Sequence, residues 1–135
     1  MLIYTAEQDA FPLTKSHDKQ PSYDLKLKAT LAIRPYENRL ISTGIKIKIP
    51  TGEVGLVLGT SRVASEGLLI FPTLFFADCD KNISVRAINV SDELITLSRG
   101  YPLAQFLPIK LGDISFCDIQ RINNNEYQDI LKQTT

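Results

Sequence analysis

Hydrophobic and polar residues alternate with a period of two along much of the chain. In residues 23–29, tyrosine, leucine and alanine alternate with aspartate and lysine, and in residues 45–49 three isoleucines alternate with two lysines. Successive side chains of a β-strand point to opposite faces of the sheet. The pattern therefore predicts antiparallel strands that bury one face and expose the other.

Short apolar or alternating runs continue through the rest of the chain. These further runs lie at residues 55–58, 68–71, 74–76, 83–90, 94–97 and 104–109. The turns that separate the runs contain Pro35, Gly44, Gly59 and residues 50–52, 80–82 and 100–102. Many short strands without helical segments between them predict an all-β fold, either an antiparallel β-barrel or a jelly roll.

The C-terminal part of the chain has a different pattern. Residues 125–132 place apolar side chains at helical spacing after an asparagine run that is able to cap a helix. We therefore expect a β domain at residues 1–111 and a tail at residues 112–135 that ends in a short helix. We expect this tail to pack on the same or a neighbouring subunit. The apolar side chains expected to make the contact are Phe116, Ile119, Ile122, Tyr127, Ile130 and Leu131.

Composition narrows the range of partners. Hydrophobic residues make up 44% of the 135 residues and charged residues 22%, and fifteen basic residues balance fifteen acidic ones. Concentrated positive charge binds nucleic acids and membrane surfaces, so we expect neither as a partner. No stretch approaches the roughly 20 apolar residues of a membrane helix, and Cys79 and Cys117 lack the spacing of a metal site. These features predict a cytoplasmic protein.

Short motifs occur in a fixed order between about Pro21 and Pro108. They read PSYDL at residues 21–25, PTGEVG at residues 50–55 and GYPLAQ at residues 100–105. In this order they resemble the trimeric dUTPase family. The resemblance implies a dUTPase-like fold and a homotrimer with active sites between subunits. It also implies hydrolysis of dUTP to dUMP and pyrophosphate, with Mg²⁺ on the triphosphate.

The first motif concerns a metal ion. Asp24 stands where the family holds its ion through water, which suits a Mg²⁺ that keeps several waters. Ser22 stands where the family usually has glycine. By resemblance Asp24 is a candidate metal-binding residue, and the alternative is an exposed aspartate on a strand.

The second motif concerns nucleotide binding. The family reads RSSLA, whereas residues 60–64 read TSRVA, so that Thr60 replaces the arginine and Arg62 lies two positions later. A guanidinium gives charge and forked donors, whereas a threonine gives one neutral donor. In extended backbone, side chains two positions apart face the same way, so Arg62 is a candidate to compensate in part for the missing arginine. Ser61 and Arg62 are therefore candidate nucleotide-binding residues.

The third motif supplies the family's general base. Counting forward from Gly67 puts Asp78 at this position, and counting backward from Ile83 puts Phe76 there, because the hairpin is shorter by two residues. In either register the family's tyrosine, arginine and glycine are missing. A general base must come within hydrogen-bond reach of its water. A catalytic Asp78 and a tight polar turn at residues 78–82 both remain open.

The fourth motif is the best preserved and the fifth is missing. Gln105 is a candidate to donate its amide to a phosphate or to a neighbouring subunit, and Tyr101-Pro102 replaces the family's Asp-Arg pair. After Pro108 the chain contains one glycine, Gly112, and no glycine-rich arm. Such an arm excludes water and completes the contacts to the phosphates.

These departures from the family predict a non-catalytic homotrimer that acts in assembly, decoration or regulation. It would require no cofactor and would contact another protein through its surface or tail. Viruses and mobile genetic elements often carry relatives of dUTPases. By this analogy we expect a viral or phage origin, with the protein in the host cytoplasm or the virion. The alternatives are a divergent dUTP diphosphatase that uses Asp78 and Mg²⁺, and a dUTP-binding nucleotide sensor.

Overall fold

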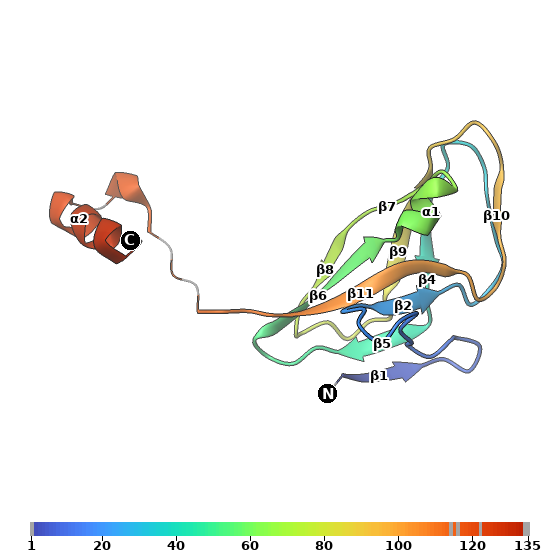
Figure 1. Ribbon diagram of the computed structural model, residues 1–135, viewed down its shortest axis with the longest axis horizontal. Helices are drawn as coiled ribbons and strands as arrows, with labels where there is room; N and C mark the ends of the chain where they lie inside the picture. Colours follow the sequence, from blue (N-terminus) through green and yellow to red (C-terminus); the bar gives the residue numbers. More distant parts are fainter. Residues whose placement is uncertain (1, 114, 116, 122, 134–135) are drawn as a thin grey trace.

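The structure is a computed structural model that describes residues 2–113, 115, 117–121 and 123–133. Every strand pairing in these residues is antiparallel. This confirms the predicted all-β fold with a C-terminal helix (Figure 1). The elements in chain order are β1 (Ile3–Ala6), β2 (Tyr23–Lys26), β3 (Leu31–Ile33), β4 (Asn38–Ser42), β5 (Ile45–Lys48), β6 (Glu53–Gly59), α1 (Ser61–Ser65), β7 (Leu68–Ile70), β8 (Thr73–Phe75), β9 (Ser84–Asn89), β10 (Ile95–Leu97), β11 (Pro102–Lys110), the 3-10 helix η1 (Ile119–Arg121) and α2 (Asn124–Gln133).

Strand β11 organises the largest sheet, whose order is β2-β11-β6-β8. Ala104 of β11 pairs with Leu25 of β2 on one side and with Gly59 of β6 on the other. This register places the PSYDL motif, the GYPLAQ motif and the end of β6, which leads into TSRVA, side by side, although they are far apart in the sequence. A second sheet has the order β4-β9-β7, and the pairs β1-β5 and β3-β10 complete the body.

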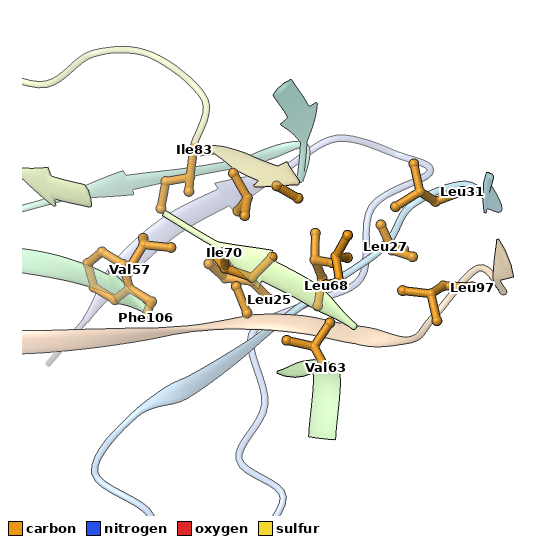
Figure 2. Close-up of a cluster of buried hydrophobic side chains, with 14 of the residues drawn as sticks. Leu25, Leu27, Leu31, Val57, Val63, Leu68, Ile70, Ile83, Leu97 and Phe106 are labelled. Atoms are coloured by element: carbon orange, nitrogen blue, oxygen red, sulfur yellow. The ribbon is translucent and has the colours of Figure 1, made fainter. Parts of the chain in front are cut away.

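The hydrophobic core lies between these sheets (Figure 2). Ile45 and Ile47 are buried, whereas Lys46 and Lys48 between and after them are exposed, as the alternation predicts. Phe106 is 1% exposed. A fully buried side chain of this size contributes about 1.5–3 kcal/mol relative to an exposed one.

The prediction missed strands that lack alternation and one short helix. Strand β4 reads NRLIS and forms by pairing with β9 along its whole length. Residues 61–65 form helix α1, although the sequence analysis treated them as extended. Val63 is fully buried and anchors this helix to the core, and Gly67 follows it at φ +91°, a conformation that favours glycine.

The tail contains the predicted helix. Asn123 accepts a hydrogen bond from the Glu126 N–H at 2.8 Å, and its amide donates to the Glu126 carboxylate at 3.1 Å, so the helix start is capped. Helix α2 lies away from the sheets in Figure 1 and buries none of its described residues. Phe116 and Ile122 lie outside the described residues. Packing of the tail on the same or a neighbouring subunit stays a prediction.

Among the described residues, no helix combines the length and the apolar character needed to cross a membrane.

Candidate functional site

A cavity of about 300 Å³ lies where β2, β11 and α1 meet. We call it the Asp24 pocket. It brings together four of the five residues that the sequence analysis proposed for the site. The residues that line it are Ser16, Gln20, Asp24, Thr60, Ser61, Arg62, Pro102 and Gln105.

Asp24 is held firmly within this pocket. Its side chain is 7% exposed, so the alternative of an exposed strand aspartate is wrong. The Ser16 hydroxyl donates to one carboxylate oxygen, and the Gln20 amide donates to the other at 3.1 Å. The backbone N–H of Asp24 donates to the Thr14 carbonyl at 2.7 Å, which ties the preceding loop to β2. These contacts fix the position of the Asp24 carboxylate at the pocket.

Gln105 of β11 links the end of β6 to the segment just before β2. Its amide nitrogen donates to the Gly59 carbonyl at 2.9 Å, and its amide oxygen accepts from the Ser22 hydroxyl at 2.6 Å. Ser22 is 3% exposed, so the serine that replaces the family's glycine uses its hydroxyl inside the fold. Gln105 therefore fixes one wall of the pocket. Contact of Gln105 with a phosphate or a neighbouring subunit stays a prediction.

Thr60 caps helix α1. Its side-chain oxygen accepts a hydrogen bond from the Val63 N–H at 3.1 Å, and its backbone is extended, as is usual at a helix N-cap. The expectation that residues 60–62 are extended is therefore wrong at Ser61 and Arg62. Both residues still line the Asp24 pocket, because the helix begins at its edge.

The guanidinium of Arg62 lies over the ring of Tyr101, with 4.8 Å between Cζ and the ring centroid. The hydroxyl of Tyr101 is buried and has no hydrogen-bond partner among the described residues. Burial raises the pKa of this hydroxyl and outweighs the opposing effect of the Arg62 charge. The guanidinium of Arg62 therefore lies against the face of the ring and close to its hydroxyl.

Asp78 lies in a separate place. It is exposed, in a turn closed by a hydrogen bond from the Cys79 N–H to the Phe76 carbonyl at 3.0 Å. This turn and strands β1 and β5 line a second cavity of about 420 Å³, which we call the Asp78 cavity. No residue lines both cavities. A single chain therefore does not bring Asp78 together with Asp24, Ser61, Arg62 and Gln105.

The sequence analysis missed Ser16, Gln20 and Tyr101. The sequence analysis gave residues 14–20 no role, but two of their side chains hold Asp24. The available signal was the position of this loop directly before the PSYDL motif. Tyr101 was noted for the charged pair that it replaces, and nothing in the local sequence indicated its contact with Arg62.

Several deoxyuridine 5'-triphosphate nucleotidohydrolases resemble this chain over most of its length. The deoxyuridine 5'-triphosphate nucleotidohydrolase of Corynebacterium jeikeium is 35% identical over 116 residues, which cover 83% of this chain and 73% of that protein. The enzyme of the same name from Corynebacterium glutamicum is 33% identical over 118 residues, which cover 84% and 79%. Among solved structures, Staphylococcus bacteriophage 80alpha dUTPase with dUPNHPP superposes with a TM-score of 0.81 at 18% identity, over 92% of this chain and 90% of that one. The last comparison shows a shared fold.

The prediction of a non-catalytic structural or regulatory protein is contradicted by these relatives. Their identity extends over more than four fifths of this chain, and their names describe nucleotide hydrolases. The prediction failed because it treated each altered motif as a lost contact. In the fold, Arg62 lines the same pocket as the position of the missing arginine, Thr60, so a displaced residue is able to supply the contact.

The match to the family extends beyond the motifs. A family model described as dUTPase matches residues 9–134, which include the loop before PSYDL, the β body and most of the tail. The chain belongs to the dUTPase family.

Proposed function

We propose that this protein hydrolyses dUTP to dUMP and pyrophosphate. The observation that carries the proposal is the 35% identity to a deoxyuridine 5'-triphosphate nucleotidohydrolase over 83% of the chain. The Asp24 pocket supports it, because it combines a buried carboxylate with a guanidinium, a hydroxyl and an amide. These are groups that bind a phosphate chain and its metal ion.

The triphosphate would lie along the Asp24 pocket. Arg62 offers charged, forked donors to phosphate oxygens, and Ser61 offers a hydroxyl. Gln105 would support this wall of the pocket through its hydrogen bonds to Ser22 and to the Gly59 carbonyl.

The pocket fits one Mg²⁺ ion. This ion binds proteins through one or two carboxylates together with substrate phosphates, and it keeps several of its waters. Asp24 is the only carboxylate among the described residues that line the pocket. Its two hydrogen-bond donors fix it and leave lone pairs for water bound to the ion. The ion would neutralise charge on the phosphates.

Asp78 would act as the general base. Its carboxylate would accept a proton from a water whose oxygen attacks the α-phosphorus. The bond from this phosphorus to the oxygen that bridges to the β-phosphate breaks, and pyrophosphate leaves with that oxygen. The family is typically homotrimeric. Because Asp78 and Asp24 line different cavities of one chain, we propose that this protein is a homotrimer in which one subunit's Asp78 faces a neighbour's Asp24 pocket.

The test measures pyrophosphate release by the purified protein with Mg²⁺. We expect release from dUTP, much less from dCTP, and loss of the activity when EDTA removes the metal. Light scattering should give the mass of three chains. Binding of dUTP without pyrophosphate release would contradict the proposal and would favour a nucleotide sensor. A stable monomer that hydrolyses dUTP would contradict the shared site.

A further inference from the structure

Arg62 is the only cationic side chain among the described residues that line the Asp24 pocket. It is exposed on a helix of five residues, and a free arginine in such a place samples many rotamers. Fixing a long side chain costs up to about 2 kcal/mol of conformational entropy. A contact that holds its guanidinium near the pocket before substrate arrives therefore increases affinity.

The ring of Tyr101 provides such a contact. Cation–π attraction acts when a guanidinium lies within about 6 Å of a ring centroid, and here the distance is 4.8 Å. Glu66 lies four residues after Arg62, where a helical ion pair is possible. Within the part of the chain that the structure describes, Arg62 forms no ion pair with Glu66. The guanidinium is placed by the ring.

The backbone fixes the position of the ring. Tyr101 N–H donates to the Ser98 carbonyl at 3.0 Å, and Leu27 N–H donates to the Tyr101 carbonyl at 2.9 Å. Gly100 precedes it at φ +90°, and a Cβ there would lie 3.2 Å from the Phe11 ring. Any other residue at this turn would be strained. The ring is therefore a rigid support.

The hydroxyl of Tyr101 does not explain why a tyrosine stands here. It is buried without a partner in the described residues, which costs free energy. Its aromatic face lies against a residue of the pocket, Arg62. The useful property of Tyr101 is its ring.

We propose that Tyr101 is a positioning residue that holds the Arg62 guanidinium at the Asp24 pocket, where it binds the triphosphate of the substrate. This inference rests on the proposed function. It explains how the chain retains a phosphate-binding cation although Thr60 stands at the family's arginine position. It also gives a role to one residue of the altered pair Tyr101-Pro102.

The test compares the unsubstituted protein with variants of Arg62 and Tyr101. Isothermal titration calorimetry measures how tightly each binds a non-hydrolysable imido analogue of dUTP in the presence of Mg²⁺. Arg62→Met removes the charge and should weaken binding about tenfold to a hundredfold. Tyr101→Leu removes the ring and should weaken binding about twofold to fivefold. Tyr101→Phe keeps the ring and should bind within about twofold of the unsubstituted protein. Tyr101→Leu added to Arg62→Met should have no further effect, because the ring acts through the arginine.

Two controls separate positioning from folding. Arg86→Met removes an exposed arginine of β9 that lies outside the pocket, and it should leave the affinity unchanged. Circular dichroism melting identifies any variant that fails to fold. Tyr101→Leu should raise KM for dUTP while changing kcat little, whereas partial unfolding would lower the active fraction and leave KM unchanged.

Other results would overturn the inference. They are unchanged affinity in Arg62→Met, unchanged affinity in Tyr101→Leu, additive losses in the double variant, or no binding by the unsubstituted protein. The proposed function has a separate criterion. If the analogue binds with the expected pattern but dUTP is not hydrolysed, hydrolysis fails as the function and the positioning role of Tyr101 stands.

Discussion

Asp24 and Asp78 are the two carboxylates of the proposed site, and their surroundings differ. Asp24 is buried on β2, where it lies opposite Gln105 of β11 in the sheet. Hydrogen-bond donors from two loop residues hold its carboxylate. Asp78 is exposed in a short turn that faces β1 and β5. The pocket around Asp24 is complete within one chain. In the proposed trimer, Asp78 would take part in catalysis at the Asp24 pocket of a neighbouring subunit.

The largest expected effect comes from Asp78→Asn. A general base contributes about 10²–10⁴ in rate, so pyrophosphate release from dUTP should fall by about that factor. An exposed turn residue contributes little to stability, so the melting temperature should stay within about one degree. Asp80→Asn, in the same segment, is the matched control and should keep most of the activity. Full activity in Asp78→Asn would show that this turn has no part in catalysis.

A mixture of two inactive variants tests whether the two regions meet across subunits. Asp78→Asn and Asp24→Asn would each be inactive alone. In randomly mixed trimers about a quarter of the sites combine an intact Asp24 pocket with an intact Asp78 from the neighbour. Co-expression should therefore recover about a quarter of the unsubstituted activity per site. Recovery of none, with mixed trimers verified by mass spectrometry, would place both carboxylates of each site in one chain.

Removal of the tail tests what holds the copies together. None of the described tail residues is buried in the single chain, and burying several apolar side chains against a neighbour would contribute several kcal/mol at about 1.5–3 kcal/mol each. Truncation after Leu111 should lower the melting temperature or dissociate the trimer, as followed by calorimetry and light scattering. If both stay unchanged while nucleotide binding weakens, the tail is a lid over the site.

The smallest expected effect concerns the wall of the Asp24 pocket. Gln105→Ala leaves the Gly59 carbonyl and the Ser22 hydroxyl without their partner. An unsatisfied buried group costs about 1–3 kcal/mol, which urea denaturation should detect as a lower free energy of unfolding. Gln128→Ala, on the exposed face of α2, should change it by less than about 0.5 kcal/mol. Equal stability of both variants would mean that Gln105 does not hold the strands together.

The sequence predicted the strands wherever alternation was clear. The isoleucines at 45 and 47 are buried and the lysines beside them are exposed, because the side-chain period of a strand is two and one face meets the core. It predicted the tail helix from apolar spacing and a capping asparagine. It did not predict α1, because five residues are too few to show a helical period.

The sequence alone determined which residue types are available for chemistry and which strand faces are buried. Tertiary structure decided which of these residues meet. Ser22 and Gln105 are 83 positions apart and touch only because β2 and β11 pair in one register. Arg62 meets Tyr101 for a similar reason, since the end of β6 and the start of β11 are neighbours in the sheet. Local patterns fix the faces of single strands, whereas such contacts depend on how distant strands align, a property that no short stretch of sequence carries.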